Sequence, residues 1–322
     1  MARDHGGDLD RARAHYGEGE WIDLSTGINP LPYPLPPITA HSWAALPTAS
    51  ARAALLQAAA AAYGTQAPMV ALAGAQAAIQ LMPLIGKRGR VRVLSPTYNE
   101  HAASYRAAGW QVEAVPRVED LAGAQVAVLV NPNNPDGRIV APQELLALHE
   151  TVGLLVVDES FVDPLPHLSL APYAGRKGLI VLRSFGKFYG LAGVRLGFAL
   201  GDGAIIEQLS TLAGPWPVAG PALEIGAAAL ADSPWASHTS ARLMNDAQRM
   251  DRLALAHGWT LAGGTPLFRL YDTPDAAAAQ HHLARHHLWS RIFPWSPRLI
   301  RLGLPGMEPQ WQRLATALGE KS

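Results

Sequence analysis

Cysteine is absent from this chain of 322 residues, which excludes disulfides, thiolate metal sites and cysteine nucleophiles. Charge is also scarce: Asp, Glu, Lys and Arg make up 16% of the sequence, against about 25% in an average globular protein. The 26 Lys and Arg residues balance the 26 Asp and Glu residues. Binding to nucleic acid or to an anionic membrane surface depends on surplus positive charge, so we expect neither kind of partner.

Long apolar runs are missing as well. The longest apolar stretches, such as residues 121–130, reach about half of the ~20 residues that a membrane-spanning helix needs. Residues 1–10 are polar and lack the apolar segment that follows the basic start of a secretory signal. We therefore expect a cytoplasmic protein, and the length of the chain predicts about two domains.

The middle of the chain alternates short apolar runs with helical patterns, which predicts an α/β domain with a mainly parallel central sheet. The expected strands are Val70–Ala73, Val91–Leu94, Gln111–Val115, Val126–Val130, Leu154–Val157, Leu179–Leu182 and Val194–Leu200. The expected helices are Ala51–Ala62, Ala75–Ile85, Asn99–Ala108 and Pro142–His149. Several of these strands are almost wholly apolar, as is typical of strands that are covered on both faces.

Two proline-rich segments interrupt this pattern and suggest where the domains divide. Residues 29–37 contain five prolines, which favour an extended arm, and residues 213–221 form a second break. The elements expected after this break are a long helix, a strand, a helix and a strand, at Ala236–His257, Pro266–Leu270, Ala276–His287 and Leu299–Leu302. We therefore predict a large domain at residues 41–214 and a smaller α+β domain built from residues 1–40 and 215–322.

The segment 184–198, SFGKFYGLAGVRLGF, carries the most informative chemical pattern. Lys187 follows an apolar strand and lies among glycines and aromatic residues, where desolvation favours the neutral amine that a Schiff-base lysine needs. Ser184 and Arg195 offer a neutral donor and a charged fork, which suit a phosphate. An isolated Gly-Lys pair is more often an ordinary surface feature, so the residues at the other strand ends decide between the two interpretations.

Polar residues follow other predicted strands. LVNPNNPDG, residues 129–137, runs from a strand into a turn in which Asn134 can donate to a phenolate-type oxygen. LLVVDESF, residues 154–161, carries Asp158 at the strand end, where open α/β sheets bind ligands. A carboxylate there can keep a pyridinium nitrogen protonated. The alternative role for Asp158 is a helix N-cap or a surface turn.

Two further segments lie at the ends of the first predicted strands. Gly74, Ala75 and Gln76 begin a helix, and the amides of that turn suit a phosphate. Tyr98 follows the next strand, where its ring can stack on a flat cofactor. The alternatives are a tight strand-to-helix turn for the first segment and a half-exposed loop tyrosine for the second.

In order and spacing, these segments resemble the fold type I pyridoxal-phosphate enzymes of the class I/II aminotransferase group. The resemblance implies that Lys187 binds the cofactor covalently, that Asp158 pairs with its pyridinium nitrogen and that Asn134 binds its O3′ atom. It also implies that Tyr98 stacks on the cofactor ring. The residues that it assigns to the cofactor phosphate are Ala75, Gln76, Ser184 and Arg195, with Gly74 next to them in the cofactor-binding set.

The N-terminal segment narrows the resemblance. His5-Gly6-Gly7, WIDLSTGINP at residues 21–30 and the prolines that follow resemble the threonine-phosphate decarboxylase branch of this group, which serves cobalamin biosynthesis. The reaction of this branch converts L-threonine O-3-phosphate into (R)-1-amino-2-propanol O-2-phosphate and carbon dioxide. The resemblance also implies a homodimer, with the site between the two domains. The substrate-binding residues that we expect are His5, Gly27, Asn29, Arg291 and Arg301.

The sequence departs from the aminotransferase pattern at two positions. Phe161 stands where many members have a tyrosine that donates to O3′, and Leu46-Pro47-Thr48 replaces a tyrosine-containing segment that reaches the partner subunit's cofactor. The first departure weakens the case for an ordinary transaminase. Two alternatives stay open: an aminotransferase for a phosphorylated substrate such as histidinol phosphate, and a pyridoxal-phosphate-binding protein without catalysis.

Four histidines on one predicted helix, His281, His282, His286 and His287, have a spacing that suggests zinc. Residue 285 is arginine, and no glutamate completes a metalloprotease motif. We therefore interpret these histidines as a solvated helix face and predict no metal site.

Overall fold

The computed structural model describes residues 5–319, which form two compact units. The large unit consists of Tyr33–Asn134 and Ile139–Ser237, and the small unit consists of Pro135–Arg138 with the residues up to Pro32 and those from His238 onward. These bounds differ from the predicted ones. Residues 33–40 and 215–237 belong to the large unit, and residues 135–138 belong to the small unit.

The break at residues 213–221 is a loop within the large unit because helix α9 (Gly220–Ala231) packs against helix α3 (Ala49–Tyr63). Leu223 and Ile225 of α9 are buried. A Cβ atom at Gly226 would lie 2.8 Å from a methyl group of Leu55, so glycine permits the close approach of the two helices. This apolar contact places the chain after the break in the large unit.

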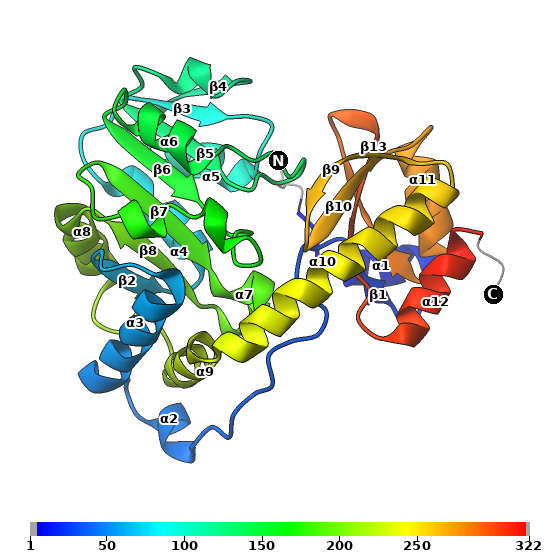
Figure 1. Cartoon of the computed structure of the whole chain (residues 1–322), viewed down its shortest axis with the longest axis horizontal. Coiled ribbons are helices and arrows are strands. Elements are labelled where there is room, and N and C mark those ends of the chain that lie inside the picture. The colour runs from blue at the N-terminus through cyan, green and yellow to red at the C-terminus, as the bar shows by residue number, and fades with distance from the viewer. Residues whose placement is uncertain (1–4, 320–322) are drawn as a thin grey trace. The chain divides into compact units, whose positions relative to one another are not determined.

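A seven-stranded sheet forms the centre of the large unit, in the order β2-β8-β7-β6-β5-β3-β4 (Figure 1). Its strands are β2 (Met69–Leu72), β3 (Arg90–Leu94), β4 (Gln111–Val115), β5 (Val126–Val130), β6 (Leu154–Asp158), β7 (Leu179–Ser184) and β8 (Gly197–Gly201). All run in one direction except β8, which is antiparallel to its neighbours β2 and β7. The prediction of a mainly parallel sheet is confirmed. The predicted strand at 194–200 is wrong in its first part, because Arg195 has a left-handed φ of 55° and the strand begins only at Gly197.

The helices of the large unit besides α3 and α9 are α2 (Ala40–Ala44), α4 (Ala75–Leu81), α5 (Asn99–Ala107), α6 (Pro142–His149), α7 (Phe185–Phe188) and α8 (Gly203–Ala213). Helix α4 ends before the predicted Ile85 and continues as a tighter turn at Met82–Leu84, since Pro83 has no N–H to extend the helix. Helices α4, α5 and α8 contact the sheet. Their buried side chains and one face of the sheet form a continuous apolar core, which includes Ile79, Tyr105, Val156 and Leu209.

The small unit contains an antiparallel sheet in the order β12-β13-β10-β9 and a parallel pair of β1 with β11. Its strands are β1 (Ile22–Asp23), β9 (Thr260–Thr265), β10 (Phe268–Asp272), β11 (Leu288–Trp289), β12 (Arg291–Phe293) and β13 (Ser296–Gly303). Its helices are α1 (Leu9–Tyr16), α11 (Ala276–Ala284), α12 (Glu308–Ala317) and α10 (Ser233–Ala256), of which residues 233–237 belong to the large unit. Helix α11 ends before the predicted His287, whose φ of 56° does not fit a right-handed helix.

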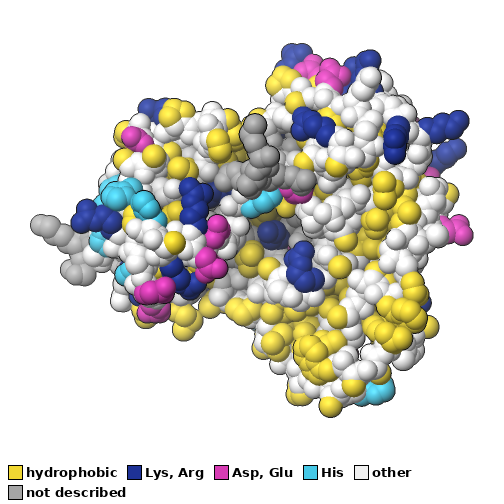
Figure 2. All heavy atoms as spheres, turned by 180° about the vertical axis from the view of Figure 1, so that it is seen from behind, with side chains coloured by type: hydrophobic (Ala, Val, Ile, Leu, Met, Phe, Trp, Pro, Cys, Tyr) yellow, Lys and Arg dark blue, Asp and Glu magenta, His cyan; other side chains and the backbone are white. Residues whose placement is uncertain are grey.

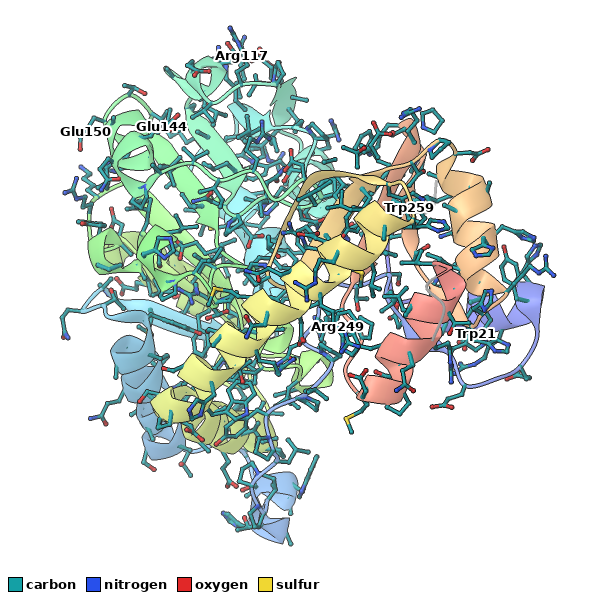
Figure 3. The ribbon with its side chains drawn as sticks, turned by 45° about the vertical axis from the view of Figure 1, so that its right-hand side comes forward. Trp21, Arg117, Glu144, Glu150, Arg249 and Trp259 are labelled. Atoms are coloured by element: carbon teal, nitrogen blue, oxygen red, sulfur yellow. The ribbon has the colours of Figure 1, made fainter. Side chains whose placement is uncertain are left out.

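Two side-chain clusters hold the helices of the small unit together. Arg249, labelled on α10 in Figure 3, donates two hydrogen bonds of 2.7 Å to the carboxylate of Glu308, and its guanidinium lies 4.6 Å from the ring centre of Trp311. Trp21 packs edge-on against Trp289, at 6.3 Å between ring centres. Within residues 5–319, no helix combines the length and the apolar character needed to cross a membrane.

Gly197 lets strand β8 approach the turn between β2 and α4. A Cβ atom at this position would overlap backbone atoms of Gly74 and Ala75 and lie 2.9 Å from the carbonyl oxygen of Arg183. These neighbours are backbone atoms, which cannot move aside as a flexible side chain can. The turn that carries Gly74 and Ala75 therefore depends on the absence of a side chain at residue 197.

We predict that Gly197→Ala lowers the free energy of unfolding by about 1–3 kcal/mol, because it forces an atom into a filled space. Gly193→Ala is the matched control, since a Cβ atom at Gly193 has no neighbour within 4 Å and its φ is not positive. Denaturant unfolding of both variants and the wild type measures the effect. Equal stability of the two variants would contradict the close packing at residue 197.

Candidate active site

One pocket of the large unit is lined by all nine residues that the sequence assigned to the cofactor. These residues are Gly74, Ala75, Gln76, Tyr98, Asn134, Asp158, Ser184, Lys187 and Arg195. They come together because Gly74 follows β2, Tyr98 follows β3, Asn134 follows β5, Asp158 ends β6 and Ser184 ends β7. These strands run in the same direction, so their carboxyl ends meet at one edge of the sheet.

One end of the pocket is suited to an anion. Gly74 has a φ of 81°, and a Cβ atom there would lie 2.9 Å from Arg195 Nη2. Glycine thus allows the guanidinium to lie directly against the turn that begins α4. The hydroxyl group of Ser184 and the amides of Ala75 and Gln76 line the same pocket. Together they offer one cation and several neutral donors, as a phosphate requires.

Asp158 presents a buried carboxylate to the pocket. Its Oδ2 atom lies 2.9 Å from His101 Nε2, and its Oδ1 atom accepts hydrogen bonds from the amide of Ser160 at 2.9 Å and from its hydroxyl at 2.5 Å. Burial alone would raise the pKa of Asp158, but the hydrogen bond and charge of His101 and the bonds from Ser160 outweigh it and hold that pKa below its usual value. Asp158 is therefore ionised at neutral pH.

His101, which is 2% exposed, was not among the site residues predicted from the sequence. His101 lies three residues after Tyr98, on α5, and this spacing places the two side chains on the same side of a helix. Their rings meet edge-on, at 6.3 Å between centres. The helical spacing from Tyr98 was the available signal, but the partner of His101 becomes evident only from the fold.

Tyr98 and Gln76 are held by a chain of hydrogen bonds. Tyr98 Oη donates to Gln76 Oε1 at 3.1 Å, and Gln76 Nε2 donates to Glu100 Oε2 at 3.0 Å. The side chain of Gln76 is therefore occupied by protein partners, which leaves its backbone amide as the group suited to an anion. The chain of bonds also fixes the orientation of the Tyr98 ring.

Lys187 lies on the short helix α7, directly after β7, and is partly buried. Its Nζ atom lies 5.7 Å from the ring centre of Phe161, which also lines the pocket. The ring supplies an apolar wall beside the amine, without the hydroxyl group that a tyrosine would present.

These residues fit the pyridoxal phosphate that the resemblance implies. The donor set around Arg195 matches a phosphate, the ionised carboxylate of Asp158 matches a protonated pyridine nitrogen, and Lys187 supplies an amine for the aldehyde. Asn134 adds an amide to the same pocket. The chemistry of each group is complementary to a different part of the cofactor.

A second pocket lies within the small unit and contains two of the predicted substrate-binding residues, His5 and Arg291. Arg11, which was not among the predicted residues, lines this pocket as well. Ser290 is 1% exposed, and its hydroxyl oxygen has no hydrogen-bond partner among the described residues. A Cβ atom at Gly6 would overlap the carbonyl oxygen of Ser25, so this glycine permits close packing at the pocket wall. Two arginines and a histidine outnumber the one carboxylate of the lining, that of Asp8, so the pocket is suited to an anion.

The other three predicted substrate-binding residues, Gly27, Asn29 and Arg301, do not line this pocket. Asn29 Oδ1 accepts a hydrogen bond of 2.6 Å from Arg242 Nη2. Arg301 is 3% exposed, and its Nη2 atom donates to the carbonyl oxygen of Ser25 at 2.7 Å. Because Ser25 lines the pocket, Arg301 lies directly behind its wall. A role of these three residues in substrate binding stays a prediction.

The predicted histidine-rich helix face lies on the small unit, where Figure 2 shows histidines gathered at the left. His281 and His282 are exposed, and His282 Nε2 contacts the carbonyl oxygen of Ala317 at 2.7 Å. Among the residues that the structure describes, no group of three or more His, Asp or Glu side chains has an arrangement that could hold a metal ion.

This chain is similar to proteins of known family. The family model "Aminotransferase class I and II" matches residues 24–318. A threonine-phosphate decarboxylase of Pseudomonas aeruginosa is 44% identical over 98% of this chain and 97% of its own length. The histidinol-phosphate aminotransferase of Sinorhizobium meliloti, solved in complex with pyridoxal-5′-phosphate, has a TM-score of 0.84 at 21% identity, over 97% of this chain and 93% of that chain. The L-threonine-O-3-phosphate decarboxylase of Porphyromonas gingivalis has a TM-score of 0.72 at 20% identity, and the match covers 86% of this chain and 93% of that chain.

The two solved structures confirm the predicted fold, which is that of the fold type I pyridoxal-phosphate-dependent transferases. The predicted resemblance to the threonine-phosphate decarboxylase branch is likewise confirmed by the identity over nearly the full chain. This chain belongs to the class I and II aminotransferase family.

Proposed function

We propose that this chain is a pyridoxal-phosphate-dependent decarboxylase that converts L-threonine O-3-phosphate into (R)-1-amino-2-propanol O-2-phosphate and carbon dioxide for cobalamin biosynthesis. Cofactor binding is supported by one pocket, which brings together an ionised Asp158, the amine of Lys187 and a turn suited to an anion. The observation that favours this substrate is the 44% identity to a threonine-phosphate decarboxylase over nearly the full chain.

The residues of the pocket divide the work of holding the cofactor. Ser184, Arg195 and the amides after Gly74 bind its phosphate, and Asp158 keeps its pyridine nitrogen protonated. The bound cofactor then supplies an electron sink for the bond that breaks at Cα of the substrate. Asn134 donates to O3′, and Tyr98 supports the ring, held by Gln76.

Lys187 has two tasks in this proposal. Its amine would hold the cofactor covalently at the aldehyde until a substrate amine takes its place. After the Cα–carboxylate bond has broken and carbon dioxide has left, Lys187 or a water molecule returns a proton to Cα. The ring of Phe161 lies beside Nζ and offers it no hydrogen-bond partner. Whether the carboxylate or the proton leaves Cα would depend on how the substrate's other contacts orient the bonds at Cα.

The reaction itself is the first test. Cofactor-loaded protein incubated with L-threonine O-3-phosphate is expected to release carbon dioxide and an equal amount of aminopropanol phosphate. Lys187→Ala is expected to lose at least about 10³-fold in kcat, because it removes the nucleophile and the proton carrier. Amine transfer to a keto acid without carbon dioxide would establish the alternative, an aminotransferase for a phosphorylated substrate such as histidinol phosphate. Cofactor binding with neither product would favour a non-catalytic pyridoxal-phosphate-binding protein.

We also propose that the small-unit pocket binds the phosphate group of the substrate. His5, Arg11 and Arg291 bring cationic or cation-forming side chains to it, and Ser290 adds a hydroxyl group without a protein partner among the described residues. A phosphate carries enough oxygens to accept from all of these groups. We expect Arg301, behind the wall at Ser25, to support the same pocket.

We predict that Arg11→Gln and Arg291→Gln each raise KM for L-threonine O-3-phosphate by about tenfold or more, since a charge-assisted hydrogen bond contributes about 1.5–3 kcal/mol. Steady-state kinetics at two salt concentrations measure the effect, and cofactor content serves as the independent check. Arg13→Gln is the matched control, because Arg13 lies on the same helix as Arg11, pairs with Asp10 and does not line the pocket. An unchanged KM in both pocket variants would contradict the assignment.

A homodimer is the proposed assembly, and an exposed apolar face of the large unit supports it. Trp43, Leu46 and Trp216 are 72%, 63% and 55% exposed. Figure 2 shows apolar side chains gathered at its lower right, the region of α2 and its neighbours. Exposed aromatic patches on a chain with little charge are typical of protein interfaces. The cytoplasmic location stays a prediction from the sequence.

We predict that Trp43→Asp combined with Trp216→Asp converts a dimeric protein into a monomer, because a carboxylate cannot be buried unpaired in an apolar contact. Sedimentation equilibrium measures the mass of each form. Trp295→Asp is the control, since Trp295 is 53% exposed but lies in the small unit. A monomeric wild type would contradict the homodimer, and a dimeric double variant would place the interface elsewhere.

A further inference from the structure

Three charged side chains lie together at the carboxyl ends of β6 and β7, two of them buried and the third, Asp163, with a side chain that is 9% exposed. Glu159 is fully buried and Arg183 is 4% exposed. Arg183 Nη2 lies 2.5 Å from Asp163 Oδ1, and Arg183 Nη1 lies 3.3 Å from Glu159 Oε2. The guanidinium carbon also lies 4.0 Å from the ring centre of Tyr63, on α3. We call Glu159, Arg183 and Asp163 the buried triad.

The buried triad lies on the face of the two strands opposite the cofactor pocket. Asp158 pairs with Leu182 in the sheet, so these two residues and Ser184 project from one face. Successive residues of a strand point to opposite faces, and Glu159 and Arg183 therefore project from the other face. Each member of this pair is adjacent in the chain to a residue that lines the pocket.

Glu159 is fixed by directed bonds at both carboxylate oxygens. Oε1 accepts from the amide of Leu170 at 2.6 Å, and Oε2 accepts from the hydroxyl of Ser169 at 2.6 Å as well as from Arg183. Its own amide donates to the carbonyl oxygen of Leu182 at 2.9 Å. A buried ion pair contributes little net stability against an apolar replacement, but it specifies one geometry because any displaced charge is left unpaired.

We propose that Glu159, Arg183 and Asp163 are positioning residues for the cofactor: from the rear face of β6 and β7 they fix the strand ends that present Asp158, Ser184 and Lys187. The inference rests on the cofactor chemistry proposed above. None of the three triad residues lines the pocket, so their action passes through their neighbours in the chain. A displacement of either strand end changes the distance between the groups that hold the two ends of the cofactor.

The triad also changes its charge near neutral pH. Burial raises the pKa of Glu159 to about 7 and raises that of Asp163, although the charge of Arg183 opposes both shifts. Tyr63, Tyr189, Ser169 and the amide of Leu170 are the other groups that face the triad, and both tyrosines stay neutral because burial raises the pKa of each. Protonation of Glu159 as the pH falls through about 7 therefore removes one negative charge from the triad.

The test uses the full-length protein loaded with pyridoxal phosphate and follows its absorbance spectrum as a function of pH. A negative charge next to the site favours the protonated form of the bound cofactor. Glu159→Gln lacks that charge, so the midpoint of its spectral transition is expected to be lower than that of the wild type by about half a pH unit or more. Arg183→Lys keeps the charge but loses the fork between the two acids, and its dissociation constant for the cofactor is expected to rise by about tenfold.

Two controls separate positioning from general destabilisation. Glu150→Gln makes the same chemical change at an exposed residue, labelled on the outside of the large unit in Figure 3, whose side chain is 69% exposed. Arg269→Lys makes the same change in the ion pair with Asp251, in the small unit. Both controls are expected to keep the wild-type midpoint and cofactor affinity. If Glu159→Gln keeps the wild-type midpoint and Arg183→Lys keeps the wild-type cofactor affinity, the positioning role is wrong and the proposed function is unaffected. If the wild type does not bind pyridoxal phosphate, both the positioning role and the proposed function are wrong.

Discussion

The pairing of β6 with β7 is the constraint on which the site depends. It places Asp158 opposite Leu182, and this register sends Asp158 and Ser184 to one face while Glu159 and Arg183 go to the other. A shift by one residue would exchange the two faces and turn the buried triad toward the pocket. The register is held by a continuous ladder along both strands and by the apolar side chains that cover each face. Pocket and triad are therefore two consequences of one alignment.

Backbone segments also lie close together at the edge of the sheet that carries the pocket. The anion-binding turn after β2 lies against β8, and Gly197 removes the side chain that would separate them. Gly74 likewise leaves room for the guanidinium of Arg195, whose left-handed φ of 55° turns the chain from α7 toward β8. Strand β8 runs opposite to its neighbours, so its first residue, Gly197, meets the carboxyl ends of β2 and β7. This direction brings the Arg195 loop to the pocket.

The sequence predicted the strand ends of the large unit well, because each buried strand is a nearly unbroken apolar run followed by polar or turn-forming residues. That local pattern was enough to find Asp158 and Lys187 and the resemblance they carry. His101 and Arg183 were not predicted, because their roles depend on contacts between residues far apart in the chain. His101 contacts Asp158, 57 residues away, and Arg183 contacts Asp163, 20 residues away. The domain bounds were also not predicted, because nothing in the proline-rich loop before α9 indicates that α9 packs on α3.

Although the net charge is zero, the arginines differ in whether they are paired with a carboxylate. Arg183, Arg249 and Arg269 are each paired with carboxylates, at distances of 3.3 Å or less. Arg195 and Arg11 have no acidic partner among the described residues, and each lines one of the two pockets suited to an anion. Both side chains are exposed and hydrated, and a bound phosphate would replace part of that hydration with charge-assisted hydrogen bonds. A substrate and a cofactor that both carry phosphate would supply the missing charge at each pocket, so the overall neutrality of the chain is compatible with two anion sites.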